Sequence, residues 1–235
     1  MKKLLHAEVP LLTPNGKTMV PMISSMDHKR ALDGDEGLNT GGMGTIAPNP
    51  YYTKEIAEEC MKTIFLPTIE AMNKEGRTFK GCLYFGLMLT PKGPKVIEYN
   101  CRFGDPETQV VLPLLKTDLF TIMKAVNEET LGDVKVEFSD EAACCVVMAS
   151  NGYPSKYETG FEIKIDTKID ADVFVAGAKI QDGKTVTAGG RVLGVTALGK
   201  DLKQAVDKAY SQVNYVTFDN AYYRKDIGKR ALEVK

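Results

Sequence analysis

The apolar positions in the first half of the chain follow two patterns, one typical of strands and one typical of a helix. Residues 9 to 25 have the strand pattern and predict two short strands around the turn "TPNGK". The next apolar run has helical spacing and predicts one amphipathic helix that starts after Thr53 as N-cap and is perturbed near Pro67. Its apolar face consists of Ile56, Cys60, Met61, Ile64 and Ile69.

A hairpin and two helices should follow. "GCLYFGLML" and "KVIEYN" flank the turn "TPKGP" and predict two paired strands. Asp105 and Pro106 have the residue types of an N-cap and a first helical residue. A second helix should run from Thr117 and Asp118 to about Asn127, with a break at Pro113 between the two.

The pattern changes after Leu131. "AACCVVMAS", "FEIKI", "DVFVAGAKI" and "RVLGVTAL" predict strands, and a final helix shares the apolar face Leu202, Ala205, Val206, Ala209 and Val213. We therefore expect an α+β protein with two domains, residues 1–135 and 136–235, the second mostly antiparallel.

Between these elements lies "DHKRALDGDEGLNTGGMGTIAPNP", residues 27–50, which predicts a long irregular loop. Five glycines in "DGDEGLNTGGMG" would let backbone N–H groups approach an anion, although a flexible surface turn is equally compatible. A calcium loop at Asp33, Asp35 and Gly37 is disfavoured because the acidic residue required at its twelfth position is missing. His28, Lys29 and Arg30 could hold a phosphate or carboxylate, or His28 could be structural.

The stretch "VIEYNCRFGDPETQ" carries the most specific chemistry. Glu98, Asn100 and Arg102 are spaced two apart, so on one strand they would share a face. Carboxylate and amide oxygens suit Mg²⁺, and a guanidinium stabilises a transferring phosphoryl or acyl group. The alternative is a surface salt bridge between Glu98 and Arg102.

Composition narrows the class of protein. The chain has 235 residues, 43% hydrophobic and 26% charged, with a net charge of −1, which is no electrostatic footprint for nucleic acid or an anionic membrane. We therefore expect no nucleic-acid or membrane partner. No apolar run approaches the roughly 20 residues of a membrane span, and the N-terminus lacks signal-peptide features. Five cysteines without paired spacing favour buried thiols at Cys82, Cys144 and Cys145 and a cytoplasmic location.

Three segments together resemble the phosphoribosylamine–glycine ligase family of the ATP-grasp superfamily. They are "DHKRALDGDEGLNTGGMGTIAPNP", "YFGLMLTPKGPKVIEYNCRFGDPETQVVLPLLKTDL" and "TAGGRVLGVTALG". The resemblance implies the C-terminal lobe of an ATP-grasp fold followed by a small β-rich domain with a packed helix. It also implies a de novo purine enzyme that joins glycine to 5-phosphoribosylamine through a glycyl phosphate, with ATP converted to ADP and phosphate.

The family motifs imply roles for particular residues. Glu98 and Asn100 would bind Mg²⁺ or Mn²⁺, Arg102 would stabilise the transferring group, and Glu8 and Lys29 would contact ATP. The small-molecule substrates would be held by His28, Asp35, Asn39, Gly41, Gly42, Asp105 and Glu107.

The sequence also departs from the family. The resemblance covers its C-terminal half only, so the adenine pocket and the phosphate-binding lysines should lie in a missing N-terminal half. "KKLL" replaces the acidic hinge, Pro10 a small polar residue and Leu38 a proline. We expect the isolated chain to be inactive and to bind Mg-ATP at most weakly. It could bind the missing half, or self-associate through exposed apolar surface.

Two alternatives remain at the level of sequence. The chain could be a non-catalytic remnant that binds or assembles, or it could belong to another ATP-grasp carboxylate–amine ligase. The segment "TAGGRVLGV" argues against the second.

Overall fold

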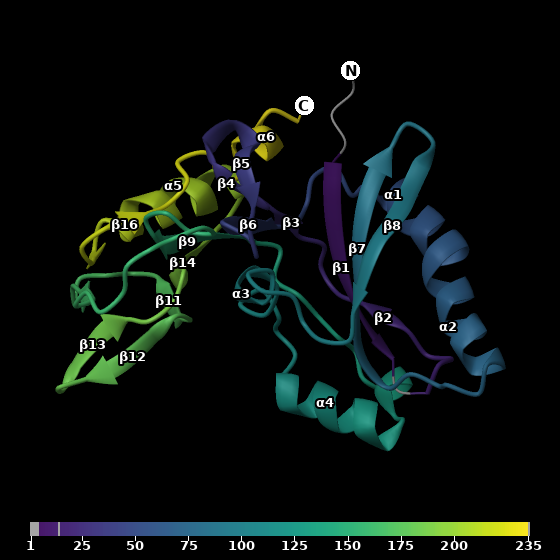
Figure 1. Cartoon of the computed structure of the whole chain (residues 1–235). Helices are drawn as coiled ribbons and strands as arrows, with labels where there is room; N and C mark the ends of the chain where they lie inside the picture. Colours follow the sequence, from purple (N-terminus) through teal and green to yellow (C-terminus); the bar gives the residue numbers. More distant parts are fainter. Residues whose placement is uncertain (1–4, 14, 235) are drawn as a thin grey trace. The chain divides into compact units, whose positions relative to one another are not determined.

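The structure, a computed structural model, describes residues 5–13 and 15–234 and divides into two compact units (Figure 1). Unit 1 contains the residues up to Met26, Pro48–Gly104 and Leu114–Ser139, and unit 2 contains Asp27–Ala47, Asp105–Pro113 and the chain from Asp140 onward. Two segments that precede residue 135 thus pack within unit 2. The family-domain boundary near residue 135 stays a prediction.

Unit 1 is built on an antiparallel sheet with strand order β2-β1-β7-β8. These strands span Val20–Pro21, Leu5–Thr13, Gly81–Thr90 and Gly93–Asn100. The predicted hairpin is confirmed as β7 and β8, and the first two strands are confirmed with β1 longer than expected. Pro14 of the turn and residues 2–4 of "KKLL" lie outside the described residues.

A helical segment covers one face of this sheet (Figure 1). It consists of α1 (Lys54–Cys60), a π-helical stretch (Met61–Phe65) and α2 (Leu66–Lys74). Thr53 caps α1 as predicted, because its side chain accepts a hydrogen bond from the Ile56 amide. The predicted perturbation is the π-helical stretch, which ends just before Pro67, a residue whose missing N–H and bulky ring disfavour a regular preceding turn.

The apolar side chains of that segment and of alternate sheet positions form the core of unit 1: Ala7, Val9, Leu11, Cys60, Ile64, Phe65, Ile69, Leu83, Phe85 and Leu87. The second predicted helix is α4 (Leu119–Glu128), capped by Asp118, and a 3-10 turn follows at Leu131–Asp133.

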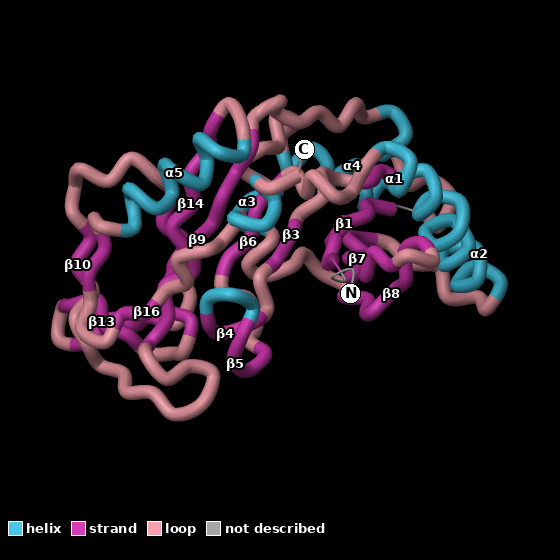
Figure 2. The backbone as a smooth tube through the Cα atoms, turned by 90° about the horizontal axis from the view of Figure 1, so that it is seen from above, coloured by secondary structure: helices cyan, strands magenta, loops and turns pink. Residues whose placement is uncertain are grey.

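Unit 2 contains a larger sheet ordered β11-β14-β9-β6-β3, with β16 also paired to β9. Two-stranded ribbons pair β10 with β15, β12 with β13 and β4 with β5. Helix α5 (Leu202–Val213) runs along β9 and β14, as Figure 2 shows, and buries the predicted face of Ala205, Val206, Ala209 and Val213.

Unit 2 has four strands before β7: β3 (Met26–Asp27), β4 (Arg30–Leu32), β5 (Glu36–Asn39) and β6 (Gly44–Ala47). Its other strands follow β8: β9 (Ala142–Ser150), β10 (Lys164–Ile165), β11 (Asp172–Val175), β12 (Ala178–Gln181), β13 (Lys184–Thr187), β14 (Arg191–Gly199), β15 (Val216–Thr217) and β16 (Ala221–Tyr222). A short terminal helix, α6, spans Lys229–Leu232.

Two local predictions for unit 2 were wrong. Residues 27–50 are not wholly irregular, because Gly44–Ala47 pairs with β9, about a hundred residues later in the chain, and no local pattern reveals such a partner. Asp105 and Pro106 do not start a helix: their peptide bond is cis, and α3 begins only at Thr108 and ends at Val111.

The cysteines Cys60, Cys82, Cys101, Cys144 and Cys145 are all free. Cys144 and Cys145 are buried and Cys82 is half-buried; burial raises the pKa of the Cys82 and Cys145 thiols to about 12. They therefore behave as packed apolar groups. None of the helices in residues 5–13 and 15–234 has the length and hydropathy needed to span a bilayer.

Candidate functional site

Polar residues of unit 1 gather on the sheet face opposite the helical segment. Strand register places Glu8 beside Gly86 and Gly86 beside Glu98, and the next row contains Tyr84 and Asn100. Residues opposite each other in an antiparallel sheet share a face, so both carboxylates and the amide point to one side. On the other side Phe85 packs against the Tyr99 ring, with centroids 5.2 Å apart.

Gly86 belongs to the same candidate site and was not predicted from the sequence. It lies in the row between Glu8 and Glu98, and a Cβ at this position would come within 2.9 Å of the Glu98 Cγ. A side chain here would therefore displace Glu98. The signal was the isolated glycine inside an apolar strand, which often marks a close approach.

Glu98 and Asn100 are open to an external ligand. Glu98 is exposed and Asn100 half-buried, and within the described part of the chain neither side chain has a hydrogen-bond or ion-pair partner. Two oxygen donors on one rigid strand fit a hard cation such as Mg²⁺. Glu8 on the same face is 2% exposed.

Arg102 does not continue this strand face. β8 ends at Asn100, and Arg102 lies in the bend that follows, where its Nη1 donates to the Phe103 carbonyl at 2.8 Å. The expectation that one strand would align all three side chains is therefore wrong for the guanidinium. Its role in stabilising a transferring group stays a prediction.

In unit 2, Asp27, Lys29 and Glu107 form a charge cluster in which both carboxylates are buried. Lys29 Nζ lies 2.5 Å from Asp27 Oδ2 and 3.5 Å from Glu107 Oε1. Burial and the nearby Glu107 carboxylate raise the pKa of Asp27 to about 7, although Lys29 acts in the opposite direction. Two carboxylates thus fix one ammonium group whose side chain remains 29% exposed.

A second group in unit 2 joins Gly41, Asp105 and Arg191. The Arg191 guanidinium contacts both carboxylate oxygens of Asp105 at 3.0 and 3.3 Å and donates to the Gly41 carbonyl at 3.0 Å. The Gly41 amide donates to the Tyr153 hydroxyl. Arg191 lies inside the quoted motif "TAGGRVLGV" but was not chosen as a site residue; its fork geometry for carboxylates was the available signal.

Gly42 has no room for a side chain. Its φ is +120°, and a Cβ would lie 2.4 Å from Pro106 Cδ and 2.7 Å from Asp27 Oδ1. The glycine therefore lets the backbone pass directly beside the Asp27 carboxylate.

His28 has mainly structural surroundings. The Gly228 amide donates to His28 Nε2 at 3.1 Å, so Nδ1 carries the proton and donates to the Gly44 carbonyl. Burial and the Arg224 charge lower the pKa of His28 to about 4. These contacts favour the structural alternative for His28.

Asp35 and Asn39 differ in exposure. Burial opposes ionisation of Asp35, but ion pairs with Arg230 and Arg224 lower its pKa overall. Asn39 is exposed at the end of β5, opposite Arg30. Their assignment to substrate binding stays a prediction.

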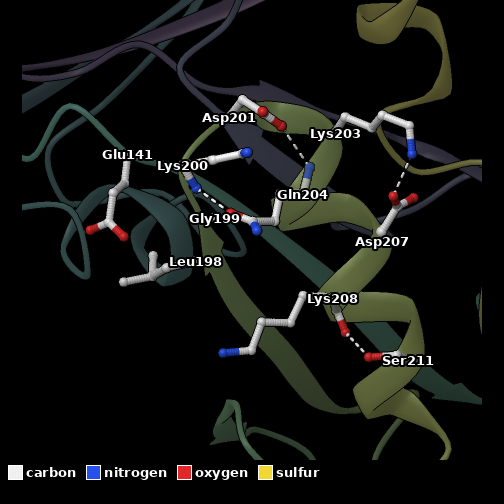
Figure 3. A pocket seen from close by; sticks show the side chains of 10 residues that line it. All are labelled: Glu141, Leu198, Gly199, Lys200, Asp201, Lys203, Gln204, Asp207, Lys208 and Ser211. Carbon is white, nitrogen blue, oxygen red and sulfur yellow. Dashed lines mark hydrogen bonds and ion pairs between the residues drawn. The ribbon is translucent and has the colours of Figure 1, made fainter.

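A surface hollow of about 840 Å³ lies beside the start of α5 (Figure 3). Several of its charges are paired: Lys203 pairs with Asp207, Lys208 pairs with Asp170, and Asp201 caps the helix. Mixed, paired charges of this kind are typical of a solvated helix face.

Comparison with known proteins identifies the family. The model of the phosphoribosylglycinamide synthetase ATP-grasp (A) domain matches residues 4–108, and the model of its C domain matches residues 143–230. The chain belongs to the phosphoribosylglycinamide synthetase family. The mixed α+β, ATP-grasp fold expected from the sequence is confirmed, as is the resemblance itself.

Individual synthetase relatives agree. A phosphoribosylamine–glycine ligase of Caldanaerobacter subterraneus is 49% identical over 91% of this chain and 51% of its own length. The trifunctional purine biosynthetic protein adenosine-3 of Gallus gallus is 49% identical over 93% of the chain and 22% of its own length. The crystal structure of the Thermotoga maritima ligase superposes with a TM-score of 0.82 at 37% identity, over 97% of this chain and 56% of that one.

The chain spans about half the length of the single-function ligases it matches. The activity of those complete ligases is therefore a proposal for this chain.

Proposed function

We propose that this chain supplies the metal-bearing strand and the acceptor-binding loop of an ATP-dependent ligase that joins glycine to 5-phosphoribosylamine. The observation that carries the proposal is the face of β8, on which Glu98 and Asn100 present oxygen donors that the described residues leave unpartnered. Family membership supplies the reaction class.

Unit 1 would act on the phosphoryl-transfer step. Glu98 and Asn100 would hold Mg²⁺ or Mn²⁺, which when bound neutralises charge on the ATP phosphates. Glu8 would contact the nucleotide side of the same sheet face. Arg102 would stabilise the γ-phosphoryl group as it leaves ADP for the glycine carboxylate.

Unit 2 would act on the second step. The phosphoribosylamine nitrogen attacks the acyl carbon of glycyl phosphate, the C–N bond forms, the C–O bond to phosphate breaks, and the nitrogen loses a proton. Residues 27–44, here called the acceptor loop, carry Lys29, Gly41 and Gly42. The family motif would put Lys29 at ATP, but Asp27 and Glu107 fix it within this loop, so we assign it to an anionic group of the acceptor substrate. Asp105 would help to place that group.

An activity assay with and without the missing half tests the proposal. Glycine-dependent ADP release with phosphoribosylamine should be undetectable for the isolated chain and should appear when the N-terminal half of a relative is added or fused. Absence of turnover in the fused protein, with both halves folded, would favour the non-catalytic remnant. Steady turnover by the isolated chain would overturn the half-enzyme interpretation.

The cytoplasmic location, the lack of a nucleic-acid or membrane partner and self-association of the isolated chain belong to the same proposal. A small purine-synthesis substrate needs neither a membrane nor a polyanion-binding surface. Sedimentation with and without the missing half tests the self-association.

A further inference from the structure

Residues 222–230, here called the C-terminal strap, are bonded to the acceptor loop along its first half. Figure 1 shows β4 and β5 beside α6, which the strap leads into. Seven polar contacts tie the two segments together: Tyr222 Oη to Ala31 O, Arg224 Nη1 to Arg30 O, Arg224 Nη2 to Asp35 Oδ1, Lys225 N to Asp33 Oδ1, Gly34 N to Asp226 Oδ2, Gly228 N to His28 Nε2 and Arg230 Nη1 to Asp35 Oδ2.

Arg224 is the centre of this contact. Its side chain is 1% exposed and is the bulkiest of the fully buried side chains. The guanidinium meets the Arg30 carbonyl, the Asp35 carboxylate and both oxygens of Asp226 at 2.8 to 3.1 Å. One planar group with several fixed donors thus joins strap and loop, which a lysine ammonium cannot reproduce.

The acceptor loop has little stability of its own at this point. Every residue of β5 is exposed, and the 3-10 turn Asp33–Asp35 buries no residue. Gly34, Asp35 and Gly37 have positive φ values of 74°, 60° and 77°. A two-stranded hairpin of this size is marginal alone in water, so its shape depends on outside contacts.

The strap, in contrast, is anchored in the core of unit 2. Tyr210 of α5 donates its hydroxyl to the Arg224 carbonyl and accepts from the Ile227 amide, both at 2.8 Å. Ile227 is buried, and a Cβ on Gly228 would contact Val206 and Ile46 at 2.8 and 3.2 Å. The strap can therefore transmit the rigidity of the core to the loop.

We propose that Arg224 is a positioning residue that holds the acceptor loop in the shape that binds the phosphorylated amine substrate. The inference rests on the proposed function, because that function makes the loop the acceptor side. Arg224 acts through the loop: the strap bonds the loop at His28, next to Lys29, and again at residues 30–35.

Hydrogen exchange of the isolated chain tests the physical part. Tyr222→Phe removes one strap contact and Asp35→Asn weakens two, while Tyr223→Phe is a matched control whose ring makes no polar contact in residues 5–13 and 15–234. Exchange at residues 30–40 should rise roughly three- to tenfold in the first two variants and remain unchanged in the control. Arg224→Lys should give a larger rise, with exchange in β9 and β14 unchanged. An equal rise throughout unit 2, or none in the loop, would overturn the proposal.

Kinetics of the full-length enzyme test the functional part. Tyr222→Phe should raise KM for phosphoribosylamine while leaving KM for ATP and kcat near those of the parent, and Tyr223→Phe should change none of the three. A general loss of kcat with unchanged KM values would contradict a positioning role. If the parent full-length protein shows no ligase activity, the proposed function fails, whereas the exchange result still decides whether the strap orders the loop.

Discussion

The two polar regions of the molecule differ in whether their polar side chains have partners within the protein. On β8 of unit 1, Glu98 and Asn100 extend from a strand and have no polar partner among the described residues. In the acceptor loop of unit 2, Asp27, Asp35 and Lys29 are each held by an ion pair.

This difference separates groups that can take a ligand from groups that hold the fold. An unpartnered exposed carboxylate costs little when it is removed, but it can bind a cation. A buried paired charge cannot lose its partner without leaving an uncompensated group. Substitutions on β8 should therefore change chemistry, and substitutions in the acceptor loop should first change stability.

The largest effect is expected for Glu98→Ala in a full-length enzyme. Turnover should fall about a thousandfold, equivalent to roughly 4 kcal/mol, because one of two protein oxygens for the metal is lost. Asn100→Ala should be milder. Steady-state ADP release at increasing magnesium measures both, and thermal denaturation should show an unchanged fold.

Glu70→Ala is the control for this prediction, since Glu70 is exposed on α2 outside the polar sheet face. It should retain normal turnover. Full activity of Glu98→Ala at saturating magnesium would show that β8 carries no metal.

The next effect concerns the acceptor loop. Gly42→Ala should destabilise unit 2 by roughly 3 kcal/mol, because the new methyl group meets Pro106 and the Asp27 carboxylate and φ is +120°. Urea denaturation measures the change.

Gly160→Ala separates the two causes. Gly160 also has a positive φ, +94°, but nothing lies within 4 Å of its added Cβ. It should cost only about 1 kcal/mol, the penalty of left-handed backbone. Equal losses at both glycines would mean that the close approach to Asp27 is unimportant.

Acid should expose two opposing contributions in unit 2. Burial lowers the pKa of His28 from 6.5 to about 4, so between these pH values the histidine binds a proton in the unfolded chain but not in the folded one. Its contribution to the free energy of unfolding is therefore fully present above pH 6.5 and is lost as the pH falls toward 4. Burial also raises the pKa of Asp27, so its contribution has the opposite sign and increases as pH falls below about 7.

Variants should separate these contributions. Asp27→Asn should leave a fall in stability of up to roughly 3 kcal/mol between pH 6.5 and 4. His28→Gln should instead gain stability relative to its own value at neutral pH over the same range. Urea denaturation at half-unit steps measures both, and parallel profiles in the two variants would refute the assignment.

The elements of unit 1 could be predicted because their signals are local. Thr53, Asp118 and the turn between β7 and β8 fix their elements through residues three or four positions away. The shared face of Glu98 and Asn100 could also be predicted, since strand alternation alone gives it, whereas their metal-binding role stays a prediction. Arg102 was misplaced because nothing local showed that β8 ends at Asn100.

The acceptor loop could not be predicted in the same way. Its order depends on Arg224 and Gly228, nearly two hundred residues away, and on β9, which pairs with β6. The composition of residues 27–50 predicts an irregular loop, and it does not reveal the distant partner that orders part of the segment as strands. Gly86 and Arg191 were missed for the same reason: each matters through residues on another strand or loop.

The smallest effect should come from magnesium added to the isolated chain. Mg²⁺ releases its water reluctantly, and two strand oxygens alone give weak binding, so 10 mM should stabilise unit 1 by about 1 kcal/mol or less. Amide chemical shifts should move near Glu98 and Gly86 and remain still in the acceptor loop. Glu98→Gln should abolish the shifts and Asn100→Asp should strengthen them, because a second carboxylate adds charge to the same face. Shifts that persist in Glu98→Gln would show that Glu98 does not bind the cation. Shifts that appear first around Asp27 would place the cation in the region whose charges are already paired and would reverse the distinction between the two units.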